Sequence, residues 1–233
     1  MVTRRTYGSY NDGCASAHAL DLIGERWALI VVRELMLGAK RFLDLQRDIP
    51  GIGPGVLSRR LRDLEESGVV VRRTLPRPAQ VAVYELTEWG HDLEDVNAAL
   101  SRWAVRSSSL PLEADMSPDT LVLAMRAHAR PAPAGAPARR VGLRLTDSRT
   151  AGHGPVEYLA TVDPGGTTVT RQAVPGDVDA RVDATTHAWK AVVIGGAAGD
   201  QGIVVSGDAA AVRALLDATR LVPAQSHQPG APR

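Results

Sequence analysis

The sequence is poor in cysteine, in aromatic residues and in net charge, and each shortage excludes a class of protein. Among its 233 residues there is one cysteine, Cys14, so an internal disulfide is impossible and a reducing, cytoplasmic compartment is expected. Aromatic residues make up only 4%, so the core must consist mainly of aliphatic side chains. The net charge of +1 predicts that any contact with nucleic acid comes from a local patch.

Long apolar runs and catalytic motifs are also missing. No run of about eighteen apolar residues occurs, and the N-terminus lacks the apolar stretch of a secretory signal, so no membrane partner is expected. The six histidines are scattered without metal-ligand spacing. Nucleophile-elbow, P-loop and dinucleotide-binding motifs are absent. We therefore expect a protein that is not an enzyme and that needs neither a metal nor a cofactor.

The chain changes character near residue 107, where a dense set of Arg and Glu gives way to "SSSLPLEADMSP". A polar stretch with Ser and Pro is typical of a linker. We predict an α+β protein with an N-terminal domain at 1–106, a linker at 107–117, a C-terminal domain at 118–221 and a disordered tail at 222–233.

Apolar spacing predicts three helices, at 15–24, 26–37 and 41–49, and a glycine-bearing turn, "GIGPG", then leads into a fourth helix at 55–66. The third and fourth helices with this turn match a helix-turn-helix. On a helical wheel of the fourth helix, the core-facing residues are Leu57, Leu61 and Leu64. Arg59 and Arg62 lie almost opposite them, with Ser58 on one flank and Arg60 on the other. This is the arrangement of a recognition helix, whose N-terminal half enters the major groove.

Two strands, at 69–74 and 80–86, follow this helix and are joined by "LPRPA". A hairpin after a recognition helix is a wing, and Arg72, Arg73 and Arg77 are placed to reach phosphates or the minor groove. Residues 40–77 contain nine basic and five acidic side chains, a local excess that the whole-chain charge hides. The alternative is a solvated helix face whose arginines pair with Asp63, Glu65 and Glu66. The order and lengths of the elements favour DNA contact.

Thr87 is a predicted N-cap for a further helix. Its apolar residues recur at spacings of 4, 3, 4 and 3, and they are Trp89, Leu93, Val96, Leu100 and Trp103. We call these five residues the seam. A seam of this kind requires a partner helix, and a small winged-helix domain has little core to cover it. Dimerisation is the favoured use, and packing against the C-terminal domain is the alternative.

Residues 14–105 resemble the HxlR family of bacterial winged helix-turn-helix regulators. The landmarks are Cys14, "IGERW", "RELMLGAKRF", "IPGIGPGVLSRRLRDLEESG" and "YELTEWG". The resemblance implies a homodimer on a palindromic operator of double-stranded DNA. It places Ser58, Arg59, Arg60 and Arg62 on the recognition helix, and Arg72, Arg73 and Arg77 on the wing. The proline-containing wing tip departs from the family pattern.

Cys14 occupies the position of a cysteine that senses oxidants or electrophiles in some HxlR relatives. A thiol near a helix N-terminus has a lowered pKa and therefore more of the reactive thiolate. With no second cysteine, a disulfide would have to join two subunits. The alternative is a small buried residue at a helix start.

In the second half, Ser117 and Pro118 predict the start of a helix. Strands are expected near 140–146, 156–163, 167–173 and 178–184, then a helix at 186–195, a strand at 202–208 and a helix at 209–218. This order, with "DARVDATTHAWKAVVIGG" and "GIVVSGDAAAVRALLDA", resembles an α/β sandwich of the sterol-carrier-protein type over residues 118–220. The resemblance implies an apolar ligand cavity, with candidate lining residues Leu121, Met125, Tyr158, Trp189 and Val193. The alternative is that these residues form a filled core.

We expect a dimeric, ligand-responsive transcriptional regulator that binds DNA through its winged helix and a small apolar effector through its C-terminal domain. Two other functions stay open. One is a regulator that senses oxidants or electrophiles through Cys14. The other is a lipid carrier whose winged helix mediates protein contacts.

Overall fold

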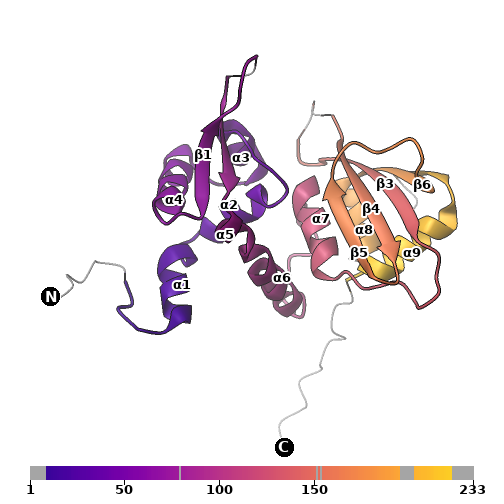
Figure 1. The fold of residues 1–233 in the computed structure, drawn as a ribbon, viewed down its shortest axis with the longest axis horizontal. Helices are drawn as coiled ribbons and strands as arrows, with labels where there is room; N and C mark the ends of the chain where they lie inside the picture. Colours follow the sequence, from indigo (N-terminus) through magenta and orange to yellow (C-terminus); the bar gives the residue numbers. More distant parts are fainter. Residues whose placement is uncertain (1–8, 79, 151, 153, 195–201, 222–233) are drawn as a thin grey trace, which may run out of the picture. The chain divides into compact units, whose positions relative to one another are not determined.

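The computed structural model describes residues 9–78, 80–150, 152, 154–194 and 202–221, and the predicted tail at 222–233 lies outside them. The fold is of the mixed α+β class, and the chain divides into two compact units, Met1–Asn97 and Ala98–Arg233 (Figure 1). This division falls before the linker predicted at 107–117. Within the described ranges, no helix combines the length and the apolar character needed to cross a bilayer.

Four helices open the N-terminal unit: α1 (Ala15–Ile23), α2 (Ala28–Leu35), α3 (Phe42–Asp48) and α4 (Pro54–Glu66). They nearly coincide with the helices expected from the sequence. Pro54 is the first residue of α4, where its fixed φ suits the helix and its missing N–H removes no hydrogen bond. The helix-turn-helix prediction is confirmed by α3, the turn and α4.

A leucine face anchors α4 in the N-terminal unit. Leu57, Leu61 and Leu64 are at most 1% exposed. α4 packs against α2, whose Val31 and Leu35 are equally buried. Burying one such side chain stabilises the fold by about 1.5–3 kcal/mol, so a rotation of α4 that exposed three leucines would cost several times that.

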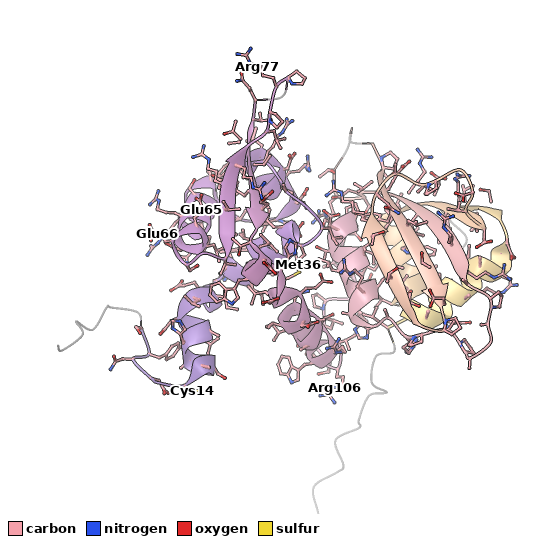
Figure 2. All side chains as sticks on the ribbon, viewed as in Figure 1. Cys14, Met36, Glu65, Glu66, Arg77 and Arg106 are labelled. Atoms are coloured by element: carbon pink, nitrogen blue, oxygen red, sulfur yellow. The ribbon has the colours of Figure 1, made fainter. Side chains whose placement is uncertain are left out.

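An antiparallel hairpin follows α4 and forms the predicted wing. Its strands are β1 (Val70–Thr74) and β2 (Ala82–Leu86). Gly68 has a φ of +76°, a left-handed conformation that glycine adopts freely, and it lets the chain turn sharply out of α4. Arg77 lies at the far end of the hairpin (Figure 2).

The single helix expected after Thr87 is divided into α5 (Glu88–His91) and α6 (Leu93–Ala104). The N-cap prediction is confirmed, because the Thr87 hydroxyl accepts a hydrogen bond from the backbone N–H of Gly90 at 3.0 Å. Gly90 is buried, and a Cβ there would collide with the carbonyl oxygen of Val69. Glycine at this position therefore permits the close approach of α5 to the start of the wing.

The C-terminal unit contains a five-stranded sheet of order β5-β4-β3-β6-β7. Its strands are β3 (Arg139–Thr146), β4 (Val156–Asp163), β5 (Gly166–Arg171), β6 (Ala180–Thr185) and β7 (Ile203–Gly207). β3 and β6 are parallel, and the other neighbours are antiparallel. The Asp163 carboxylate accepts the N–H groups of Gly165 and Gly166 at 2.7 and 3.2 Å, which holds the predicted hairpin turn.

Three helices, α7 (Pro118–Ala127), α8 (Thr186–Val193) and α9 (Ala209–Thr219), pack against this sheet. Val141 and Leu143 of β3 are fully buried, whereas Arg144 on the opposite face binds Asp183 at 2.7 Å. Alternation of this kind is typical of a sheet covered on one side. The helices and strands expected in this half are present, and the resemblance to the sterol-carrier type stays a prediction.

The segment just before α7 is bonded to the C-terminal unit. Lys190 is only 6% exposed, and its ammonium donates to the backbone carbonyls of Leu112 and Ala114. His187 contacts the Asp115 carboxylate at 2.9 Å. Part of the predicted linker is therefore a fixed part of this unit.

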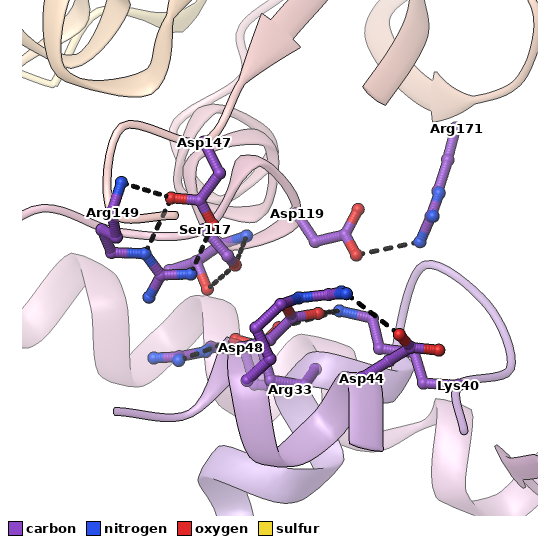
Figure 3. A network of polar contacts seen from close by, with 12 residues as sticks. Arg33, Lys40, Asp44, Asp48, Ser117, Asp119, Asp147, Arg149 and Arg171 are labelled. Atoms are coloured by element: carbon purple, nitrogen blue, oxygen red, sulfur yellow. Dashed lines mark hydrogen bonds and ion pairs between the residues drawn. The ribbon is translucent and has the colours of Figure 1, made fainter. Parts of the chain in front are cut away.

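A buried cluster of charges joins α2, α3 and the segment between them. The Lys40 ammonium lies 2.9 Å from the carboxylates of both Glu34 and Asp48 (Figure 3), and all three residues are at most 7% exposed. Arg47 binds the other oxygen of Asp48 at 2.9 Å. Burial acts to raise the pKa of Asp48, but Lys40 and Arg47 outweigh it and leave that pKa below its ordinary value.

We predict that Lys40→Met destabilises the N-terminal unit by about 3–5 kcal/mol at neutral pH, because two carboxylates stay buried without their cation. Folding lowers the pKa of Asp48, so the contribution of Asp48 is complete above the ordinary value of 3.8 and is lost as the pH falls through the folded-state pKa. Urea unfolding at pH 7 and pH 3 measures both effects, and the loss of stability in Asp48→Asn relative to the wild type should be smaller at pH 3 than at pH 7. The exposed Arg106→Met is the control, and equal stability of Lys40→Met and the wild type would contradict the prediction.

Candidate nucleic-acid interface

The face of α4 opposite its leucines carries the side chains predicted to read DNA. Ser58, Arg59 and Arg62 are exposed. Neither guanidinium forms an ion pair or hydrogen bond with any residue that the structure describes. Two arginines without partners on one exposed helix face are available to bind guanine edges or phosphates.

Arg60 is placed differently from the prediction. Its side chain is only 9% exposed, and its guanidinium lies 3.5 Å from the Glu25 carboxylate and 3.2 Å from that of Asp63. These pairs hold Arg60 on the inner flank of α4, so it is not exposed as Arg59 and Arg62 are, and its contact with DNA stays a prediction. Of the recognition-helix arginines, Arg60 is the one that pairs with an acidic residue of α4, namely Asp63, among the described residues. Glu65 and Glu66 lie at the C-terminal end of α4 (Figure 2).

The wing arginines differ in how free they are. Arg72 is exposed and its guanidinium lies 5.9 Å from the ring centroid of Tyr84, a cation–π contact. Arg73 is 66% exposed and forms an ion pair with Glu85. Arg77 is exposed near the wing tip (Figure 2). All three are on the surface, as the wing prediction requires.

Val56 is a residue of this surface that the sequence analysis missed. It lies in the first turn of α4 and is 44% exposed. An apolar side chain at the N-terminal end of a recognition helix can contact the methyl group of thymine. Its position on the helical wheel, away from the three leucines, could have identified it from the sequence.

The seam is largely exposed. Trp89, Val96, Leu100 and Trp103 are 43–69% exposed. Leu93 is half-buried. α1 also has no buried residue, and its Leu20 is 51% exposed. The seam and α1 therefore each expose apolar side chains of the kind that protein partners cover.

Cys14 is exposed at the N-cap of α1, where Figure 2 labels it. The pKa of its thiol lies below the ordinary value of 9.0, because the nearby backbone N–H groups of Ala17 and Ser16 and the Ser16 hydroxyl favour the thiolate, although the side chain makes no capping hydrogen bond to α1. The first N–H groups of a helix have no partner within the helix, which leaves them free for this role. The site is suited to reaction with electrophiles.

The five residues predicted to line a cavity lie in the core of the C-terminal unit. Leu121, Met125, Tyr158, Trp189 and Val193 are at most 1% exposed. The Tyr158 hydroxyl donates to Asp119 at 2.7 Å, and Arg171 binds the other oxygen of Asp119 at 3.0 Å (Figure 3). These contacts match the filled-core alternative, and none of the five residues lines the groove of this unit described below.

Comparisons with known proteins bear on the N-terminal half. Residues 22–110 match the family of HxlR-like helix-turn-helix proteins. The chain is 37% identical over 86 residues to the HTH-type transcriptional regulator YodB of Bacillus subtilis, spanning 37% of this chain and 77% of YodB. It is 35% identical over 86 residues to YvaP of the same organism, an uncharacterised HTH-type transcriptional regulator, spanning 37% of this chain and 80% of YvaP.

Solved structures of YodB also align with the chain. The reduced form has a TM-score of 0.38 at 34% identity, covering 41% of this chain and 95% of YodB. A quinone-bound form of YodB has a TM-score of 0.34 at 34% identity, covering 38% of this chain and 93% of YodB. With helices, wing and sequence relationships in agreement, the chain belongs through residues 22–110 to the HxlR-like family of helix-turn-helix transcriptional regulators.

Proposed function

We propose that the protein is a dimeric transcriptional regulator that binds a palindromic operator through α4 and the wing, and that its C-terminal unit responds to a small effector. The observation that carries this proposal is the pair of arginines, Arg59 and Arg62, which have no partner among the described residues and lie on the exposed face of a leucine-anchored helix. Two such helices in a symmetric dimer would meet half-sites about one helical turn, or a multiple of it, apart.

The surface residues divide into two roles under this proposal. Arg59, Arg62 and Val56 contact base edges, because they lie on the exposed side of the recognition helix. Arg72 and Arg77 on the wing bind phosphates, which add affinity without sequence information. Arg60 pairs with Glu25, and its contact with DNA stays a prediction.

We predict that Arg59→Ala and Arg62→Ala each weaken operator binding by about 1–3 kcal/mol and relax the preference for particular bases. Arg77→Ala should weaken binding to the operator and to unrelated duplexes equally. It should also reduce the slope of log affinity against log salt concentration by about one. Fluorescence anisotropy with an operator selected from random duplexes measures both.

The control is Arg106→Ala, which removes an exposed arginine that pairs with none of the described residues and lies outside α4 and the wing, and it should leave affinity unchanged. Unchanged operator affinity in the Arg59 and Arg62 variants would instead support a lipid carrier whose winged helix contacts proteins.

Dimerisation through the seam is the second part of the proposal. We predict that native mass spectrometry finds twice the chain mass of 24.8 kDa, and that Val96→Glu with Leu100→Glu yields the monomer, because a dimer interface would bury both carboxylates. Asp95→Lys, an exposed position of α6 outside the seam, is the control and should stay dimeric. A wild-type monomer, or a dimer unaffected by the double variant, would refute this use of the seam.

The effector part of the proposal concerns the C-terminal unit. An effector changes DNA binding only if it has different affinities for the DNA-competent and the incompetent conformation. The sterol-carrier resemblance supports a small apolar ligand, but the core position of the five predicted lining residues directs attention to another surface of this unit.

A second candidate function is a redox or electrophile response through Cys14. Its exposure and the lowered pKa of its thiol support this function, as does the sequence relationship to YodB, which has been crystallised bound to a quinone. Such a response would need no ligand in the C-terminal unit.

We predict that iodoacetamide alkylates Cys14 with a reaction midpoint at lower pH than for an unstructured cysteine peptide. Ala17→Pro removes one of the N–H groups that favour the thiolate, at a position in the first helical turn where proline is tolerated, and should raise that midpoint. Diamide or a quinone should then change operator affinity in the wild type and not in Cys14→Ser. If operator affinity is the same with and without the oxidant, the redox function is dismissed.

A further inference from the structure

The C-terminal unit has an open groove of about 510 Å³ that no function discussed above uses. Its walls are the loop 130–138, Arg139 at the start of β3 and one side of α9, and Val162 of β4 completes the lining. Small-molecule sites in proteins span about 300–1,000 Å³, so the groove has the size of a ligand site.

Most of the lining is apolar and small. The loop contributes Pro131, Pro133 and Pro137, which have no backbone N–H to offer a ligand. The helix contributes alanines, among them Ala210 and Ala214, whose short side chains leave the space open. The groove therefore favours contact with an apolar molecular surface.

The loop wall is held in place by hydrogen bonds to three other elements. The Arg130 N–H donates to the carbonyl of Ala218 in α9 at 2.9 Å, and the Ala132 N–H donates to the carbonyl of Asp163 in β4 at 2.9 Å. The Thr167 hydroxyl of β5 donates to the Arg130 carbonyl at 2.7 Å. A groove with fixed walls binds without a large ordering cost.

Four charged side chains line the groove, and they are not equally engaged. Arg139 forms an ion pair with Asp208 at 3.0 Å, and the Arg130 guanidinium donates to the backbone carbonyl of Asp217 at 2.7 Å. Arg213 is exposed and has no ion pair or hydrogen bond with any described residue. With Asp217 as the one acidic lining residue, the lining carries a positive excess, and Arg213 is the cation left for a ligand.

We propose that this groove binds a small amphipathic carboxylate. The apolar body lies against the alanines of α9 and the prolines of the loop. The carboxylate pairs with the Arg213 guanidinium, whose fork geometry suits two parallel hydrogen bonds. The inference deepens the proposed function, on which its regulatory consequence rests, because it names the site and the class of effector.

The test uses the full chain and isothermal titration calorimetry without DNA. The probes are 2-naphthoate and octanoate, as aromatic and aliphatic carboxylates, and 2-naphthamide as the neutral match of the first. We expect at least one carboxylate to bind, and Arg213→Ala to weaken it about tenfold or more while leaving any binding of the amide unchanged. Ala214→Leu, which fills the groove at a half-exposed position, should remove carboxylate binding.

Arg106→Ala, an exposed arginine of the same unit outside the groove, is the matched control and should bind as the wild type. Failure of both carboxylates to bind below about 1 mM would overturn the proposal. Carboxylate binding that is unchanged in both Arg213→Ala and Ala214→Leu would also overturn it. So would a change of oligomeric mass in Ala214→Leu, because that result would assign the groove to a protein partner. Operator affinity measured without these probes tests the regulator function separately, so the two failures are distinguishable.

Discussion

The burial of Leu57, Leu61 and Leu64 is the constraint on which the functional surface depends. Once three leucines fix the rotation of α4 about its axis, the direction in which every other side chain of the helix faces is also fixed. Arg59 and Arg62 must point outward, and Arg60 must turn toward Glu25. Adjacent arginines on one helix therefore have opposite placements, because Arg59 and Arg62 are exposed and Arg60 is held by the fold. The buried Lys40 cluster supports this arrangement, because its ion pairs hold α3 to α2, the helix on which α4 packs.

The N-terminal fold was predictable because its signals are local. Periodic leucines, Pro54 at a helix start and Thr87 at a cap each act within a few residues, and the structure places them as expected. The burial of Arg60 was not predictable in the same way. Its partner Glu25 is distant in the chain, and no spacing rule connects them. The division between α5 and α6 was missed because the apolar spacing continues across Asp92.

The C-terminal unit shows the same limit more strongly. The strand expected near 178–184 is present as β6, but its parallel pairing with β3 depends on tertiary packing and was not predicted. The large apolar residues expected around a ligand are in the core, because large side chains are the ones that fill space. The groove is lined instead by alanine and proline, which no hydrophobic pattern marks.

The most direct measurement of the central claim is chemical protection of arginines by operator DNA. Phenylglyoxal modifies accessible guanidinium groups, and mass spectrometry of peptides compares free and DNA-bound protein. The account predicts that Arg59 and Arg62 are reactive in the free protein and protected in the complex, while Arg213 stays reactive in both and Arg60 is slow in both. Equal modification of Arg59 and Arg62 with and without bound DNA would contradict it.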